Sequence, residues 1–151
     1  MADWWQWSPK KEEGILTFAV VGVGRFGTAV CRELISNGAE VLAADSSEKA
    51  IDDLRQLEPS IEARVIDCTD EESMKESGIL EMNTVVVGIS EPIEASITTT
   101  LIAKDSEGTK VKRVIARATS DLHEKMLKRV GADKVVFPSS CLLYTSDAAD
   151  E

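Results

Sequence analysis

Short apolar runs rich in β-branched residues alternate along the chain with amphipathic stretches of helical period, and no hairpin turn signal separates them. The runs that predict strands are residues 16–21, 40–44, 62–66, 84–89, 113–116 and 134–137. Because a helical stretch joins each strand to the next, right-handed crossovers would make all the strands parallel. The pattern therefore predicts the α/β class: a doubly wound, parallel, six-stranded Rossmann-like sheet with helices on both faces.

Five helical stretches fill the gaps between these strands, and the spacing of their apolar residues predicts their buried faces. Ser46 or Ser47 is expected to cap the second helix, and Thr69 with Glu72 forms a capping box for the short third helix. The first helix is expected at 28–37 and the fifth at 120–130. The buried stripes expected of the first, second, fourth and fifth helices are Phe26, Val30 and Leu34; Ala50, Ile51, Leu54 and Leu57; Ile93, Ile97 and Leu101; and Leu122, Met126 and Val130.

The size and charge of the chain exclude several classes of function. Its 151 residues are the length of one ordinary domain, and its 17 basic residues against 27 acidic ones give a net charge of −10. An acidic balance argues against binding of nucleic acid or anionic lipid. The three cysteines (Cys31, Cys68 and Cys141) are an odd number without CxxC spacing. We therefore expect a reduced, cytosolic compartment and neither a metal site nor a disulfide framework.

Both ends of the chain are expected to lie outside the domain, which spans residues 15–138. Residues 1–14 form an N-terminal extension with three tryptophans, interpreted either as rings lying on the domain surface or as an anchor that docks on a partner. Residues 139–151 are interpreted as a non-native C-terminal tail, because 141–151 resembles the translation of an adapter used in preparing sequencing libraries. The natural protein is then expected to continue past Pro138; a genuine short acidic terminus is the alternative.

A glycine-rich loop follows the first predicted strand and opens the first helix. It has the pattern GxGxxG, and its residues are Gly22, Val23, Gly24, Arg25, Phe26 and Gly27. Gly22 would allow the tight turn, Gly24 the approach of a diphosphate to the backbone, and Gly27 close packing of helix on strand. Asp45 closes the second strand, where a carboxylate accepts hydrogen bonds from ribose hydroxyls and repels a 2′-phosphate. The loop thus predicts a dinucleotide or nucleotide site that disfavours NADP.

Several segments in the same order resemble the RCK (KTN, TrkA-N) domain, the cytosolic nucleotide-binding domain that regulates bacterial potassium uptake systems and channels. They are residues 18–27, 41–45, 67–72, 93–96 and 131–138. The resemblance implies that Arg25 reaches the nucleotide phosphates, that Asp45 holds the ribose, and that Asp67 with Cys68 lies near the adenine. Ser46, next to Asp45, is counted with this site.

Arg117 follows the fifth predicted strand at the same edge of the sheet as these loops. Ligands gather at that edge in open α/β sheets. Three interpretations therefore stay open for Arg117: a nucleotide contact, a contact to a neighbouring subunit, and a plain surface arginine.

Two departures from the family pattern are visible. Family members usually carry a glutamate directly after the closing proline, at a cation site in some of them, whereas Ser139 stands there in this chain. A second, ligand-binding RCK-C domain often follows in the family and is absent here, which fits truncation.

The resemblance implies a regulatory subunit rather than an enzyme: it binds ATP/ADP or NAD(H) and gates a membrane potassium transporter or channel. Its implied assembly is a homo-oligomer of dimers building a ring, cytoplasmic and peripheral to the inner face of the cell membrane. One alternative is the cofactor-binding half of an NAD-dependent dehydrogenase; Arg25 argues against it, because dehydrogenases usually place small or apolar side chains in this loop. The other is the cytosolic domain of a cation/proton antiporter.

Catalytic chemistry finds little support in the residues themselves. His123 is the only histidine, and it is interpreted as a surface or packing residue because it has no nearby partner in the sequence. Cys31 lies within a helical pattern, where it is expected to pack as a small apolar residue. We therefore predict no catalytic residues.

Overall fold

The computed structural model describes residues 16–138. The predicted N-terminal extension, the predicted tail and Cys141 lie outside the described residues. The strands are β1 (Thr17–Val21), β2 (Glu40–Asp45), β3 (Glu62–Val65), β4 (Thr84–Val87), β5 (Arg113–Arg117) and β6 (Lys134–Val136). The helices are α1 (Arg25–Ser36), α2 (Glu48–Leu57), α3 (Glu71–Ser77), the 3₁₀ turn η2 (Ile79–Glu81), α4 (Ile93–Asp105) and α5 (Asp121–Arg129).

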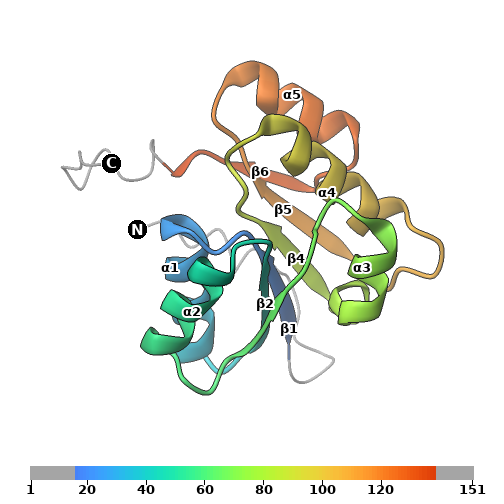
Figure 1. Cartoon of the computed structure of the whole chain (residues 1–151). Helices are drawn as coiled ribbons and strands as arrows, with labels where there is room; N and C mark the ends of the chain where they lie inside the picture. Colours follow the sequence, from blue (N-terminus) through green and yellow to red (C-terminus); the bar gives the residue numbers. More distant parts are fainter. Residues whose placement is uncertain (1–15, 139–151) are drawn as a thin grey trace.

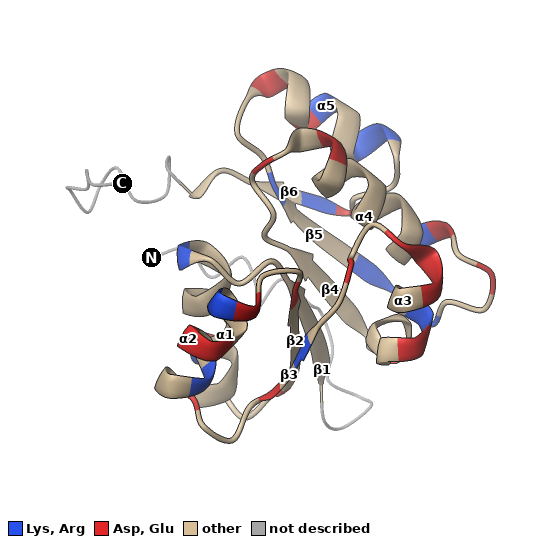
Figure 2. Ribbon diagram, viewed as in Figure 1, with Lys and Arg blue, Asp and Glu red and all other residues tan. Residues whose placement is uncertain are grey.

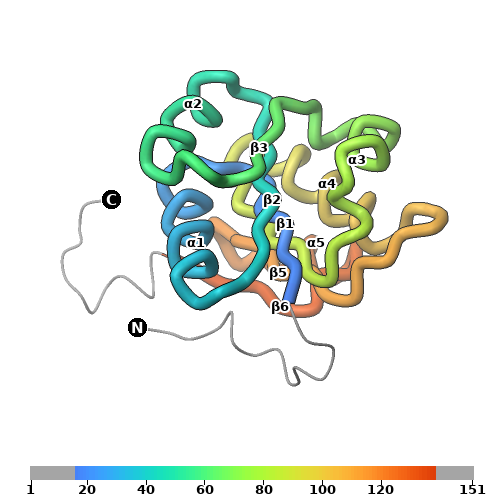
Figure 3. The backbone as a smooth tube through the Cα atoms, turned by 90° about the horizontal axis from the view of Figure 1, so that it is seen from below, coloured from blue at the N-terminus to red at the C-terminus, as the bar shows by residue number. Residues whose placement is uncertain are grey.

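All six strands join one parallel sheet in the order β3-β2-β1-β4-β5-β6. Helices α1 and α2 cover one face and α3, α4 and α5 the other, as Figure 1 shows and the view of Figure 3 repeats from below. This is the doubly wound Rossmann arrangement, with its strand order reversing between β1 and β4. The predicted fold class is confirmed.

The central strands β1 and β4 are buried on both faces, which explains their uninterrupted apolar sequences. In β1, Phe18 and Val20 pack toward α1 and α2, whereas Ala19 and Val21 pack toward the other three helices. Neither strand carries a charge, and Figure 2 shows the charged residues on the helices, the loops and the outer strands. No helix in the described part of the chain has the length and apolar character needed to cross a membrane.

The predicted faces of α4 and α5 are wrong. Leu101 and Leu122 are 43% and 66% exposed, and Ile93 and Met126 are also exposed. The residues that α4 buries are Ser96, Thr99, Thr100 and Ala103, and those that α5 buries are His123 and Leu127. Hydrogen bonds account for the burial of Ser96, Thr99 and His123, because a buried hydroxyl or imidazole with a partner no longer carries the full cost of leaving water. The hydroxyl of Thr100 has no such partner among the described residues. The apolar pattern of α2 is also shortened, since Leu57 is exposed.

The structure corrects the predicted starts of α1 and α3 and decides between the two predicted caps of α2. Helix α1 begins at Arg25, three residues before the predicted start, so the glycine loop runs directly into it. Ser47, not Ser46, caps α2 by accepting from the amide of Ala50. Asp70 caps α3 by accepting from the amide of Ser73, so the predicted capping box is wrong. The Thr69 hydroxyl donates instead to Asp67, which frees the next residue to act as the cap.

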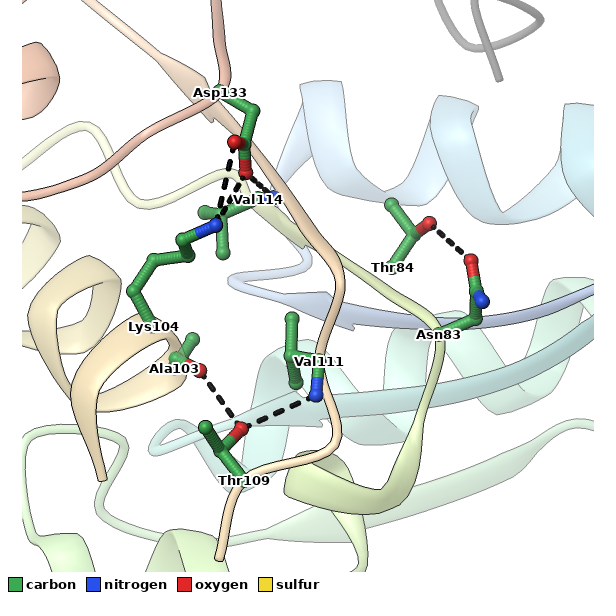
Figure 4. A network of polar contacts seen from close by, with 8 residues as sticks. All are labelled: Asn83, Thr84, Ala103, Lys104, Thr109, Val111, Val114 and Asp133. Atoms are coloured by element: carbon green, nitrogen blue, oxygen red, sulfur yellow. Dashed lines mark hydrogen bonds and ion pairs between the residues drawn. The ribbon is translucent and has the colours of Figure 1, made fainter. Parts of the chain in front are cut away.

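A polar network fastens the amino ends of β4 and β5, at the edge opposite the glycine loop (Figure 4). Asp133, just before β6, accepts from the backbone amide of Val114 at 2.8 Å and from the ammonium of Lys104 on α4 at 3.0 Å. Thr109 donates to the carbonyl of Ala103 at 2.9 Å. These contacts tie the amino end of β5 and the start of β6 to α4.

Candidate functional site

A pocket of about 440 Å³ opens at the carboxyl ends of the strands, where the strand order reverses. This volume lies within the range of small-molecule sites. The predicted site residues that line it are Gly22, Gly24, Arg25, Asp45, Ser46, Asp67, Cys68 and Arg117. Val23, Phe26 and Gly27 lie behind this lining and support it, as their contacts below show. The fold therefore brings together residues at the carboxyl ends of four strands, β1, β2, β3 and β5.

The glycine loop is held by two positions that accept no side chain. Gly22 has a φ of +92°, and a Cβ there would stand 2.8 Å from the amide nitrogen of Ile89. A Cβ on Gly27 would collide with the carbonyl oxygen of Gly22, so α1 closes against the turn that precedes it. Gly24 differs, because a Cβ there would meet nothing within 4 Å and would project into open space beside the pocket.

Asp45 is fixed by the backbone on both of its carboxylate oxygens. The amide of Val23 donates to Oδ2 at 2.8 Å, and the amide of Ser47 donates to Oδ1 at 2.9 Å. A carboxylate has about four lone-pair sites, so each oxygen can still accept a further hydrogen bond. Asp45 therefore ties the glycine loop to the end of β2 while keeping acceptor capacity toward the pocket.

Two arginines bring positive charge to the pocket from different elements. Arg25 is the first residue of α1, where helix amides and the helix dipole favour an anion. Arg117 ends β5, and its guanidinium lies 5.4 Å from the centroid of the Phe26 ring. Burial lowers the pKa of Arg117 below its ordinary value, yet an arginine remains a cation at neutral pH. Its Nε is buried and makes no hydrogen bond within the described part of the chain.

Asp67 and Cys68 follow β3 at the other end of the pocket. The side chain of Asp67 is exposed and accepts from the Thr69 amide and hydroxyl, and these hydrogen bonds hold its pKa below the ordinary value. Burial, with the nearby charges of Asp45 and Asp67, raises the pKa of the Cys68 thiol to about 12. Cys68 is therefore a neutral thiol at physiological pH and a poor nucleophile.

The strand order arranges these charges along the sheet edge. From β3 across to β5, the order is Asp67, then Asp45, then the glycine loop with Arg25, then Arg117. The aspartates thus lie on one side of the glycine loop and Arg117 on the other. A ligand with hydroxyls at one end and phosphates toward the other matches this polarity.

Sequence reasoning missed the loop that follows β4. Gly88, Ile89, Ser90, Glu91 and Pro92 line the pocket. Their proximity to the glycine loop is direct, since the amide of Gly88 donates to the carbonyl of Val21 at 2.7 Å. Thr69 and Ala95 line the pocket as well. The signal available in the sequence was positional: β4 neighbours β1 in the doubly wound order, and the loops after both strands meet where the order reverses.

The two remaining candidates for chemistry are buried. Cys31 is fully buried in α1, as its interpretation as a packing residue required, and burial raises the pKa of its thiol to about 12. His123 is 1% exposed and packs inside rather than on the surface. This agrees with the packing interpretation; its ring lies 2.9 Å from the hydroxyl oxygen of Ser96, 27 residues away on α4, and accepts from the amide of Thr119, four residues away. Among the described residues, no group of three or more His, Cys, Asp or Glu side chains is placed to hold a metal ion.

Comparison with known proteins decides the family. A family model described as the TrkA-N domain matches residues 18–138, which is nearly the whole of the described fold. The chain belongs to the TrkA-N domain family. The resemblance drawn from the glycine loop and the later segments is thereby confirmed.

One curated relative of this TrkA-N domain is Ktr system potassium uptake protein C of Bacillus subtilis (strain 168). It is 40% identical over 121 residues, a match that covers 80% of this chain and 52% of the relative. The chain thus spans about half the length of the curated relatives it matches.

Solved structures agree on the fold. The TrkA-N domain of inner membrane protein ybaL from Escherichia coli has a TM-score of 0.72 at 23% identity, covering 87% of this chain and 93% of that one. The GsuK channel bound to NAD has a TM-score of 0.69 at 15% identity, covering 88% of this chain and 23% of the channel. GsuK has also been solved bound to ADP, with a TM-score of 0.67 at 16% identity, covering 88% of this chain and 34% of that one.

Proposed function

We propose that this TrkA-N domain is the regulatory, nucleotide-binding part of a potassium uptake system. It binds ATP/ADP or NAD(H) in the pocket at the carboxyl edge of the sheet and controls a membrane potassium transporter or channel. The observation that carries this proposal is the pocket itself, which combines an open glycine loop, a fixed acceptor at Asp45 and two arginines.

Each pocket residue has a role in this proposal that suits its chemistry. The backbone at Gly24 and the guanidinium of Arg25 hold the phosphates, and Asp45 accepts from the ribose hydroxyls, with Ser46 beside it. Asp67 and Cys68 lie near the adenine. Arg117 approaches the phosphates from β5, which selects the first of the three interpretations left open by its sequence position.

The proposed role is binding rather than catalysis. Cys68 lines the pocket, and a cysteine is a good nucleophile only as a thiolate. The raised pKa keeps Cys68 a neutral thiol. The guanidinium of Arg25 adds a charged side-chain contact to the phosphates, which favours ligands with highly charged phosphates over a cofactor bound only by the backbone amides of the loop. Both features support a module that senses a nucleotide.

The partner is proposed from the relatives, and the assembly from the resemblance to the RCK domain. The Bacillus relative is named as a potassium uptake protein of the Ktr system, and GsuK is a channel solved with NAD and with ADP. By analogy, we propose that this domain assembles as a homo-oligomer, with dimers building a ring. The ring would lie in the cytoplasm against the inner face of the membrane, bound to a potassium transporter or channel subunit.

Thermal unfolding of the purified 151-residue chain with ATP, ADP, NADH and NADPH at equal concentration tests the binding claim. A ligand that binds only the folded state stabilises it by about 2.7 kcal/mol at one hundred times its Kd, so the best ligand raises Tm most. We expect a rise in Tm with at least one of ATP, ADP and NADH. NADPH should raise Tm less than NADH, because Asp45 repels the 2′-phosphate. If none of the four ligands changes Tm, the proposed function is wrong.

A further inference from the structure

The single histidine is buried at the contact of α5 with α4, next to two pocket-lining segments. His123 is 1% exposed, and its Nε2 lies 2.9 Å from the hydroxyl oxygen of Ser96 on α4, which is itself fully buried. On the other side of the ring, the backbone amide of Thr119 donates to Nδ1 at 3.1 Å. Both ring nitrogens therefore have partners within the protein.

These contacts define the tautomer of the ring. Because Nδ1 accepts from an amide, it carries no proton, so the single proton of the neutral imidazole is on Nε2. Nε2 then donates to the Ser96 hydroxyl. A serine hydrogen-bonded to a histidine also occurs in nucleophilic catalysis, but there a substrate reaches the serine. Here Ser96 is 0% exposed, so the pair has a structural purpose.

The partners of His123 are neighbours of pocket residues in the chain. Thr119 comes two residues after Arg117, and Ser96 comes directly after Ala95, and both Arg117 and Ala95 line the pocket. Between Arg117 and Thr119, the amide of Ala118 donates to the carbonyl of Val136 at 2.9 Å. The two amides that follow Arg117 are thus both fixed, one by β6 and one by the His123 ring.

We propose that His123 is a positioning residue of the nucleotide site: its Nδ1 holds the backbone after β5 so that Arg117 lies against Phe26 and toward the ligand's phosphates. Its bond to Ser96 fixes the tautomer and the ring orientation that make Nδ1 an acceptor. This inference rests on the proposed function, because it concerns the same pocket.

Calorimetric titration of the 151-residue chain with ADP and with adenosine tests this role. Asparagine at position 123 keeps an acceptor near the place of Nδ1, whereas glutamine keeps a donor near the place of Nε2 and loses that acceptor. We expect His123→Gln to weaken ADP binding at least about fivefold, within the range of coupling inside one hydrogen-bond network. His123→Asn should stay within about twofold of the wild type, and adenosine, which lacks phosphates, should bind all variants equally.

A double-mutant cycle with Arg117→Ala separates positioning from loss of stability. If His123 acts through Arg117, His123→Gln should weaken ADP binding no further once Arg117 is alanine. Leu127→Val, one turn along α5 and fully buried, is the matched control: it lowers stability and should leave ADP affinity unchanged. His123→Leu, which fills the same space without an acceptor, replaces the glutamine variant in the cycle if that variant does not fold.

Equal losses in His123→Asn and His123→Gln, additive losses in the cycle, or unchanged ADP affinity in His123→Gln would each overturn the inference. The failure of the proposed function gives a different result, since the wild-type chain would then not bind ADP, ATP or NADH.

Discussion

At the residue scale, Gly24 and Gly27 are three positions apart in the GxGxxG motif and have different reasons to lack a side chain. Gly24 has a φ of −74° and open space around its missing Cβ, so no neighbouring atom blocks a methyl group there. Gly27 has no such space, because the Gly22 carbonyl occupies it. The fold requires the second glycine, and in our proposal the ligand requires the first.

We therefore predict that alanine at position 24 mainly weakens nucleotide binding, whereas alanine at position 27 mainly lowers stability. Gly24→Ala should lower the free energy of unfolding by less than about 1 kcal/mol, the scale of an N-cap change, and should weaken nucleotide binding through the added methyl group. Gly27→Ala should lower the free energy of unfolding by about 1–3 kcal/mol, as overpacking does. Urea unfolding and calorimetry on both variants check this. Nucleotide affinity retained in Gly24→Ala would mean that the phosphates do not approach this backbone.

Asp45 combines a structural and a proposed binding role, so its removal should have two effects. Asp45→Ala leaves the amides of Val23 and Ser47 without their acceptor, which lowers stability. It should also weaken every adenosine nucleotide by about 1.5–3 kcal/mol, the usual contribution of hydrogen bonds to a charged acceptor. The difference between NADH and NADPH should narrow, since the repulsion of the 2′-phosphate is lost.

Calorimetry with both dinucleotides measures these changes. Asp53→Ala removes an exposed carboxylate of α2, outside the pocket lining, and serves as the control for charge alone. Unchanged affinity for every ligand in Asp45→Ala would place the ribose elsewhere.

At the element scale, α5 is anchored by a histidine whose protonation the fold disfavours. Burial lowers the pKa of His123 from its ordinary value of 6.5. As the pH falls through 6.5, the unfolded chain takes up a proton that the folded chain resists, so the free energy of unfolding falls. This contribution to stability is complete above the unfolded-state pKa and is lost as the pH falls through the folded-state pKa.

We predict that His123→Asn removes this part of the acid sensitivity. Urea unfolding of wild type and variant at about pH 7.5 and about pH 5.5, on either side of the ordinary histidine value, measures it. The loss of stability between the two pH values should be smaller in the variant, because the remaining titrating groups are common to both proteins. An identical pH dependence would show that His123 is not held neutral by the fold.

The helices that flank this histidine mark the limit of periodicity arguments. The strands followed from their apolar runs, and the central strands β1 and β4 did so most clearly, since a strand buried on both faces needs an apolar run whatever it packs against. The buried face of α4 carries Ser96, Thr99 and Thr100 instead. Thr99 donates to the carbonyl of Cys68 at 2.9 Å, a partner 31 residues away that no local pattern reveals. Apolar spacing fails to predict a buried face where distant hydrogen bonds of this kind allow polar side chains to be buried.

At the scale of the whole molecule, the difference between local patterns and distant contacts also separates the predicted from the missed parts of the pocket. The glycine loop and Asp45 carry recognisable residue types at fixed positions relative to strands, so the sequence pattern indicated them, whereas Asp67 came from the family resemblance. The loop after β4 carries no such motif, and its place beside the glycine loop comes from the order of the strands. Phe26 is a third case: the motif named it, but only the fold shows that it supports Arg117.

The central claim is that the pocket senses the charged phosphates of a nucleotide, and Arg25 is the residue that tests it. Arg25 is exposed at the start of α1, so its removal perturbs no core packing. A guanidinium there contributes charge-assisted hydrogen bonds that grow with the charge on the outer phosphates. ATP carries a terminal γ-phosphate, whereas the diphosphate of NADH is bridged on both sides.

The decisive measurement is the calorimetric affinity of ATP and of NADH for the wild type, for Arg25→Ala and for Arg32→Ala. Arg32 lies on the same helix, exposed and paired with Glu58, and its removal gives the same change of net charge outside the pocket lining. We predict that Arg25→Ala loses about 1–3 kcal/mol of ATP binding and much less of NADH binding. Arg32→Ala should bind both as the wild type does. Equal losses for the two ligands in Arg25→Ala would contradict the claim that Arg25 senses the outer phosphates, and NADH binding with little ATP binding to the wild type would favour a dehydrogenase cofactor site.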